Sequence, residues 1–424
     1  MEVTIQAPPA LVQRPAPAGR HGLPRPRHPL WLAPFRPLFA GAGICALLAP
    51  LVWLWPGDMP VDPRLWHLHE LVFGMCGAAL GGYLLTALPA WTGPECGRIP
   101  SHMLIWLTLL WLAARLALPF SASLSFGPQL ALALGYFILL AGVLARPLIA
   151  ARLWGRLWAV GAVLVMALGN ALIVADMRGL LDATALPLAM VLFFAALIGW
   201  VGGRAVPAFT RSWLQRRAAR RAPRDTPIIA IAALVATLLG AGLVLADMTE
   251  AAGPCLIVAG FLQAARLAGW RSRLAWRYPA LLMLHLAWLW LPCGLILLGT
   301  ALMRPDLLAP GAALHALSMG AMGSMILAIT ARAAMARDDG RLIAGPALSG
   351  AFLLVWLSAL PRVLAGVLPA DWPDPVRVSA FVWMLGWVLF LYGLRPALTG
   401  PLPAPVLSAA QRKTAPIPEA GAQP

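Results

Sequence analysis

Twelve apolar stretches, each long enough to cross a lipid bilayer, occupy most of this 424-residue chain. A hydrocarbon core about 30 Å thick is crossed by about 20 apolar residues in a helix, which satisfies its own backbone polar groups where water is absent. The chain is 61% hydrophobic and 11% charged, unlike soluble globular proteins. We therefore expect an all-α, polytopic integral membrane protein with spans near residues 38–55, 71–90, 103–119, 128–147, 156–175, 183–203, 228–246, 251–268, 278–300, 311–331, 343–369 and 377–394.

The distribution of basic residues predicts the orientation. If the N-terminal tail is cytoplasmic, 26 of the 32 Lys and Arg residues fall on the cytoplasmic side, five fall on the other side, and Arg115 lies inside the third span. Such an imbalance follows the positive-inside rule. We expect both termini in the cytoplasm, with a disordered basic tail over 1–37, one twelve-helix domain over 38–396 and a second disordered tail over 397–424.

The same imbalance explains the net charge of +16 without a nucleic-acid partner. The basic loop expected over Arg204–Arg224 is interpreted as a cytoplasmic anchor, with binding of RNA or of anionic lipid as the alternative. Five scattered cysteines without a CxxC pair indicate neither a zinc knuckle nor a disulfide framework. The sequence also contains no Walker A, GxSxG or HExxH motif, so no classical catalytic motif indicates an enzyme.

The stretch Trp66-His67-Leu68-His69-Glu70 places two of the seven histidines and a carboxylate at the mouth of the second expected span. Imidazole is a common protein ligand of haem iron and of copper. Polar side chains within or beside a bilayer cost free energy, so their presence points to a function. The stretch is therefore a candidate metal or haem site.

One pattern, H-x-L-x-x-G-x-x-G, begins at His69 in the second span and at His315 in the tenth. Both spans run in the same direction, so the two histidines enter at similar depth, and imidazoles on different helices can sandwich a haem iron. The glycines leave room for a macrocycle or for a neighbouring helix. The pattern thus indicates either a bis-histidine haem or close helix packing with the histidines as satisfied polar groups.

The roles of His67, His285 and Arg115 have alternatives. On a helix His67 points about 200° away from His69, whereas in an extended chain both point the same way, and His67 then ligates a separate ion or supports the first site. His285 lies about 10 Å from the cytoplasmic edge of its span and is either a ligand or a buried polar group. Arg115 pairs with Glu70, pairs with haem propionates, or snorkels to the outer interface.

Several motifs occur in order along residues 29–395, and together they resemble one family. They are Pro34-Phe35-Arg36-Pro37-Leu38-Phe39, Trp66-His67-Leu68-His69-Glu70-Leu71-Val72-Phe73-Gly74, Pro89-Ala90-Trp91-Thr92-Gly93, Gly203-Arg204-Ala205-Val206-Pro207-Ala208-Phe209-Thr210, Leu284-His285-Leu286 and His315-Ala316. The set looks like NnrS, a family of twelve-helix bacterial inner-membrane proteins that carry haem and copper and are linked to nitric oxide metabolism, denitrification and nitrosative stress.

The resemblance implies that His67, His69, His285 and His315 are candidate metal and haem ligands. Ala90 departs from the family pattern, which usually has Asn before Trp-Thr-Gly, so any hydrogen bond made by that side chain is missing here. A milder departure is the Ala that precedes Arg115, where Gly is common.

We therefore expect an NnrS-type protein of the bacterial inner membrane. In this hypothesis His69 and His315 bind b-type haem near the outer face, with Arg115 beside it, and His67 or His285 helps to hold copper or a second haem. Nitric oxide is the expected small-molecule ligand, and the electron donor is unidentified. The alternative is a secondary transporter of a small solute or a metal, although that class predicts repeated halves and charged midplane groups.

Overall fold

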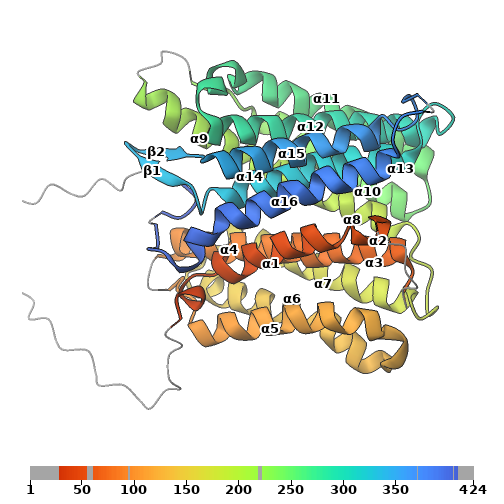
Figure 1. Ribbon diagram of the computed structural model, residues 1–424, viewed down its shortest axis with the longest axis horizontal. Helices are drawn as coiled ribbons and strands as arrows, with labels where there is room; N and C mark the ends of the chain where they lie inside the picture. Colours follow the sequence, from red (N-terminus) through yellow and green to blue (C-terminus); the bar gives the residue numbers. More distant parts are fainter. Residues whose placement is uncertain are drawn as a thin grey trace, which may run out of the picture.

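The computed structural model describes residues 28–54, 61–93, 96–217, 222–369, 371–403 and 405–408. Within these residues twelve helices are long and apolar enough to cross a membrane, which confirms the predicted all-α polytopic fold. The helices lie side by side along one direction (Figure 1). Their spans are Phe35–Leu54, Pro63–Thr92, Ser101–Phe120, Phe126–Ala150, Trp154–Asp176, Leu186–Arg216, Pro227–Leu245, Thr249–Gly269, Pro279–Met303, Pro310–Ala331, Pro346–Val363 and Pro375–Thr399.

Several spans consist of more than one helical segment. The α-helices are α1 (Phe35–Leu48), α2 (Leu51–Leu54), α3 (Pro63–His69), α4 (Gly77–Thr92), α5 (Ser101–Ala117), α6 (Phe126–Ala150), α7 (Trp158–Asp176), α8 (Leu186–Leu197), α9 (Gly203–Arg216), α10 (Pro227–Leu245), α11 (Thr249–Gly269), α12 (Pro279–Met303), α13 (Pro310–His315), α14 (Ser324–Ala331), α15 (Pro346–Val363) and α16 (Pro375–Thr399). Three π-helices interrupt them, namely η2 (Glu70–Cys76), η5 (Ile198–Gly202) and η7 (Ala316–Gly323). Short 3₁₀ helices are η1 (Pro29–Leu32), η3 (Leu118–Ser123), η4 (Trp154–Arg156) and η6 (Ser272–Arg277).

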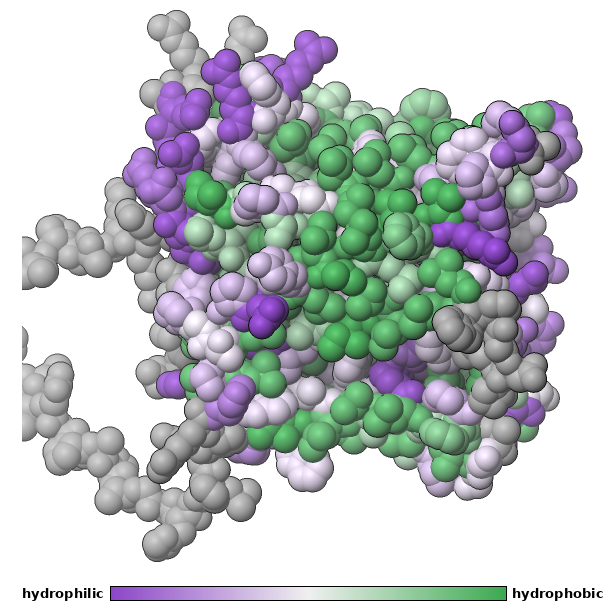
Figure 2. All heavy atoms as spheres, viewed as in Figure 1, coloured by the Kyte–Doolittle hydropathy of each residue, from purple (hydrophilic) through white to green (hydrophobic). Residues whose placement is uncertain are grey.

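The surface carries an apolar band between two polar ends. Figure 2 shows apolar residues gathered across the middle of one face and hydrophilic residues gathered at both ends of the helices. Large apolar side chains remain exposed along the spans, for example Leu116 at 62%, Ile228 at 78% and Phe381 at 64%. Because such exposure costs free energy in water but not in hydrocarbon, the band is the surface that faces lipid.

The second span begins earlier than its hydropathy predicted. Asp62 caps α3, because its Oδ1 accepts hydrogen bonds from the backbone N–H of Arg64 at 2.8 Å and of Leu65 at 3.0 Å, and Pro63 occupies the first turn, where its missing N–H costs nothing. His67 and His69 therefore lie on a helix, which selects the diverging orientation.

Three other boundaries also extend the helices. α9 continues through residue 216, so more than half of the basic loop expected over Arg204–Arg224 is helical. α1 begins at Phe35, within the tail expected over 1–37, and α16 ends at Thr399, within the tail expected over 397–424. Residues 1–27 and 409–424 of those tails lie outside the described residues.

The first and last spans pack against each other. The indole N–H of Trp383 on α16 donates to the carbonyl of Ala46 on α1 at 2.7 Å. At the end of the bundle that holds both described ends of the chain, the guanidinium of Arg36 donates to the carbonyls of Pro29 and Gly400 (Figure 1). An even number of spans thus brings the start of α1 and the end of α16 to the same face of the membrane.

The three π-helices recur in every fourth span, the second, sixth and tenth, and each overlaps a G-x-x-G sequence. These are Gly74 to Gly77, Gly199 to Gly202 and Gly320 to Gly323. π-Helices are rare and are found mostly at functional sites. His69 and His315 are each the last α-helical residue before such a segment, so the shared sequence pattern marks a shared backbone feature.

The space beside these glycines is filled by neighbouring side chains. A Cβ atom added at Gly77 would lie 3.0 Å from the ring of Phe137, and one added at Gly323 would lie 2.4 Å from the ring of Trp383. One added at Gly74 would meet Cys45 and Glu70, both within 3.1 Å. In this structure the glycines therefore serve close packing of helices and aromatic rings, the second of the two expected roles.

A small hairpin lies outside the bundle at the end where the described chain begins and ends (Figure 1). Strands β1 (Ala336–Asp338) and β2 (Arg341–Ile343) pair antiparallel, with Arg337 opposite Leu342. The turn between them uses two residues of positive φ, Asp339 at 40° and Gly340 at 66°, as two-residue hairpin turns require.

Candidate functional site

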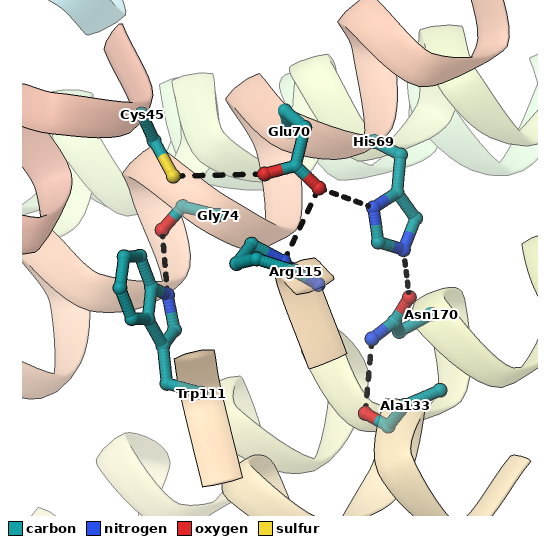
Figure 3. Close-up of polar contacts among 8 residues, drawn as sticks. All are labelled: Cys45, His69, Glu70, Gly74, Trp111, Arg115, Ala133 and Asn170. Atoms are coloured by element: carbon teal, nitrogen blue, oxygen red, sulfur yellow. Dashed lines mark hydrogen bonds and ion pairs between the residues drawn. The ribbon is translucent and has the colours of Figure 1, made fainter. Parts of the chain in front are cut away.

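His69 lies at the centre of a buried polar network that joins the first five spans (Figure 3). Its Nε2 is 2.8 Å from Oδ1 of Asn170 on α7, and its Nδ1 is 3.2 Å from Oε1 of Glu70. The amide of Asn170 is oriented by its other end, because Nδ2 donates to the carbonyl of Ala133 at 2.9 Å. Both ring nitrogens of His69 therefore face acceptor oxygens, so a hydrogen bond to Glu70 needs a proton on Nδ1 or on the carboxyl group.

Glu70 carries the ionic part of this network. Nε of Arg115 lies 3.2 Å from Glu70 Oε1 in an ion pair that lacks the alignment of a hydrogen bond. The thiol of Cys45 lies 3.6 Å from Oε2. The side chains of Glu70 and Arg115 are 7% and 8% exposed. Of the three roles expected for Arg115, the pairing with Glu70 is the one observed.

His67 and His315 form a second group. The two histidines lie within electrostatic range of each other, and both lie within range of Arg362 at the end of α15. Both rings remain partly exposed. The tenth span thus places His315 within electrostatic range of His67, and none of the contacts among the described residues joins His315 to His69.

These two rings share one hydrogen-bonding arrangement. Nδ1 of His67 lies 3.1 Å from the carbonyl of Ala49 and 3.3 Å from Nε1 of Trp53. With its proton on Nδ1 the ring donates to the Ala49 carbonyl, and with its proton on Nε2 it accepts from the indole N–H of Trp53. Nδ1 of His315 likewise contacts the carbonyl of Gly311, one turn earlier. Neither Nε2 has a hydrogen-bond partner among the described residues. Both imidazoles are thus held through Nδ1 and have Nε2 available for a ligand.

His285 belongs to a third environment, near the opposite end of the bundle. Its Nε2 lies 2.9 Å from the hydroxyl of Thr210 on α9, and its Nδ1 lies 2.9 Å from the hydroxyl of Ser272. The ring of Trp270 lies edge-on to it, with centroids 6.4 Å apart. With hydroxyl partners at both nitrogens, His285 has the contacts of a satisfied buried histidine.

The four histidines expected to be ligands therefore occupy three places. His67 and His315 lie within electrostatic range of each other, while His69 and His285 each have their own polar partners. No group of three or more His, Cys, Asp or Glu side chains with the arrangement of a metal site occurs in the part of the chain that the structure describes. Beside His69, where the ring of Phe73 lies at a centroid distance of 5.2 Å and the adjoining cavity measures about 20 Å³, a porphyrin does not fit in this conformation.

Sequence reasoning missed several polar partners. Asn170 is fully buried and holds His69 in place, and Gln129 is 5% exposed on α6. A polar residue inside an apolar span is the signal that singled out Arg115, and it applies equally to these two amides. The hydroxyl partners Thr210 and Ser272 carry no such signal, since hydroxyls are common in membrane helices and often bond to their own helix.

Comparison with known proteins agrees with the sequence motifs. The model of the NnrS protein family matches residues 29–401, a range that includes all twelve spans. No curated protein matches the sequence. With most of the chain covered, the protein belongs to the NnrS family of membrane proteins, which is linked to nitric oxide.

Proposed function

We propose that this protein binds haem iron or copper in the bacterial inner membrane and acts in nitric oxide metabolism or in resistance to nitrosative stress. The observation that carries the proposal is the shared arrangement of His67 and His315. Each ring is held through Nδ1 by a main-chain carbonyl and has a free, partly exposed Nε2.

This arrangement is the one that metal-ligating histidines adopt. A ligand imidazole usually donates its second ring N–H to a carbonyl or carboxylate, which fixes the tautomer and raises the basicity of the ligating nitrogen. The acceptors at His67 and His315 are main-chain carbonyls, Ala49 on the first span and Gly311 on the tenth. A metal bound between the two Nε2 atoms would connect the second span to the tenth.

The donor set fits both expected groups. Two imidazoles are the axial ligands of many b-type haems, and imidazole also suits copper. When bound, oxidised haem iron or copper would accept an electron from a donor that the chain does not identify, and the reduced metal would supply an open or exchangeable position for nitric oxide.

Arg362 adds an electrostatic preference. A fixed positive charge near a metal favours the oxidation state with the smaller positive charge, because the repulsion is weaker. Arg362 lies within electrostatic range of both His67 and His315. We infer that it raises the reduction potential of the centre and so favours the reduced form, which binds nitric oxide.

His69 receives a positioning role in this proposal. Its two nitrogens are engaged by Glu70 and Asn170, so it fixes the start of the π-helix η2, three residues after His67. The pairing of His69 with His315, expected from equal depth, competes directly with the pairing of His67 with His315, and the same experiment separates them.

The test is an optical spectrum and a metal analysis of the purified protein in its His67→Ala, His69→Ala and His315→Ala forms. His67→Ala and His315→Ala should each lose the reduced haem bands or the bound copper, whereas His102→Ala, a change at an exposed helix start, should match wild type. Full retention in both variants at normal expression would refute the site. Loss in His69→Ala with retention in His67→Ala would restore the pairing first expected.

Growth under a nitric oxide donor tests the cellular role. Cells that carry His67→Ala or His315→Ala should grow more slowly than wild type with the donor and equally well without it. His102→Ala cells should tolerate the donor like wild type. Equal tolerance in all strains would refute the proposed role, even if the metal site proved correct.

A further inference from the structure

A small cavity lies beside His69, between α5, α6 and α7. Its volume is about 20 Å³, and of the nine residues on its wall only His69, Arg115 and Gln129 have polar side chains. A space of this size holds on the order of one water molecule or one small ion. The cavity lies on the side of the second span occupied by His69, and neither His67 nor His315 contributes to its wall.

Three buried nitrogen atoms in this wall have no hydrogen-bond partner among the described residues, namely Nε and Nη1 of Arg115 and Nε2 of Gln129. Nε of Arg115 is ion-paired with Glu70, which leaves Nη1 of Arg115 and Nε2 of Gln129 without either kind of partner. The side chain of Arg115 is 8% exposed, and Gln129 is 5% exposed. The amide of Gln129 cannot be flipped to remove the problem, because its Oε1 accepts a hydrogen bond from Nε of Arg178 at 2.9 Å. Buried donors without acceptors are rare in folded proteins.

The free hydrogen-bonding atoms of these side chains are donors only. His69 is already engaged at both nitrogens, and the side-chain oxygen of Gln129 is taken by Arg178. A water molecule would accept from Arg115 and Gln129, but its own two hydrogens would find no free side-chain acceptor. An anion carries lone pairs alone, so it satisfies both donors without adding unsatisfied hydrogens.

The charge of Arg115 favours the same class of occupant. A guanidinium in a low-dielectric interior attracts an anion strongly, and charge-assisted hydrogen bonds are shorter and stronger than neutral ones. Glu70 lies at Nε of Arg115, whereas the unpartnered atom is Nη1, so the ion pair leaves part of the guanidinium uncovered.

We propose that this cavity binds a small monovalent anion, held by Nη1 of Arg115 and Nε2 of Gln129. Its size suits chloride or bromide, and bent nitrite is the upper limit, whereas tetrahedral sulfate is too large. The site is separate from the pair formed by His67 and His315, and it does not depend on a bound metal.

Bromide provides the direct test. Crystals of the wild-type protein grown or soaked in sodium bromide should give an anomalous-scattering peak between Arg115 and Gln129. Density at that position without anomalous signal would identify a water molecule, and an empty position would leave the donors unpaired. Either result would overturn the proposal.

Thermal unfolding of the detergent-purified protein gives an independent test. Sodium chloride and sodium nitrite should each raise the Tm in a saturable manner relative to sodium gluconate at equal ionic strength, and sodium sulfate should not. Equal responses to chloride, nitrite and sulfate would indicate general salt effects and would overturn the proposal.

Gln129→Glu is the decisive variant. One carboxylate oxygen keeps the bond to Arg178, and the other replaces the anion at Arg115. Chloride affinity should fall about tenfold or more, as loss of a hydrogen bond to a charged group predicts, and the bromide peak should vanish. Gln215→Glu adds the same charge at an exposed position on α9 and should leave both responses unchanged. An unaltered chloride response in Gln129→Glu would refute the site. If that variant does not fold, the bromide experiment on wild type still decides.

Discussion

Nε2 of His69 on the second span lies 2.8 Å from Oδ1 of Asn170 on the fifth, and both residues are buried. The contact fixes one face of the second span toward α7. His67 precedes His69 by two positions on the same helix, so the His67 imidazole points away from α7. It points toward the side of the second span where Trp53 and His315 lie. The position of one histidine thus determines the direction of the other.

Replacing Asn170 should weaken the bundle. Asn170→Ala removes the partners of His69 Nε2 and of the Ala133 carbonyl, and we expect the free energy of unfolding to fall by about 2 kcal/mol. Thr108→Ala is the control, because that hydroxyl bonds only to Leu104 of its own helix. Thermal unfolding in detergent measures both. Equal losses would mean that the Asn170 contacts add nothing.

Substitutions of Glu70 and Arg115 should have coupled effects on the free energy of unfolding. Arg115→Leu leaves a buried carboxylate without its partner and should cost about 3–5 kcal/mol, whereas the double variant with Glu70→Leu should recover part of that loss. Arg115→Lys should be intermediate, since it keeps the charge but loses the planar guanidinium. A double-mutant cycle on unfolding free energies measures the coupling. Strictly additive losses would show that the two side chains do not interact.

The glycines of the π-helices should tolerate no side chain. Gly323→Ala places a Cβ 2.4 Å from Trp383 and should destabilise the protein by about 1–3 kcal/mol through overpacking. Gly311→Ala in the same span meets nothing within 4 Å and should change the Tm little or raise it. Comparison of the two Tm values is the measurement. A harmless Gly323→Ala would mean that the Trp383 ring moves freely.

The orientation in the membrane is testable at two exposed loops. A reporter inserted at Gly340, in the turn of the β-hairpin, should report the cytoplasm, and one inserted at Asp182, after the fifth span, should report the opposite side. The expectation rests on the placement of 26 of the 32 basic residues on the hairpin side. Reporters on the same side would be incompatible with twelve spans in this order.

The number, order and type of the spans follow from the sequence because length and apolarity alone decide whether a helix can cross a bilayer. The start of the second span did not follow from the sequence, since α3 (Pro63–His69) contains charged and aromatic residues. Its N-terminal cap at Asp62 is a local signal that an averaged hydropathy does not detect. The same cap starts the helix before His67, so the side chains of His67 and His69 point in different directions.

The grouping of the site residues could not be predicted for a geometric reason. Equal depth made His69 and His315 natural partners, but depth does not specify which way a helix is rotated or which helix lies beside it. His69 is directed by Asn170, a residue of a span that carries none of the motifs, and His315 lies near His67 and Arg362. Polar partners such as Asn170 and Gln129 were visible in the sequence as single amides in apolar spans, but their targets were not.

Because of the π-helix η2, the number of residues between the motifs of the second span matters as much as which residues they are. A π-helical turn contains more residues than an α-helical one, so deletion of one residue between Glu70 and Cys76 would allow the segment to close as an ordinary α-helix. The part of the span before the deletion would then turn by about 100° relative to the part after it. Related sequences that keep every histidine and glycine but differ by one residue between them would therefore direct His67 away from His315 and should not be expected to form the same centre.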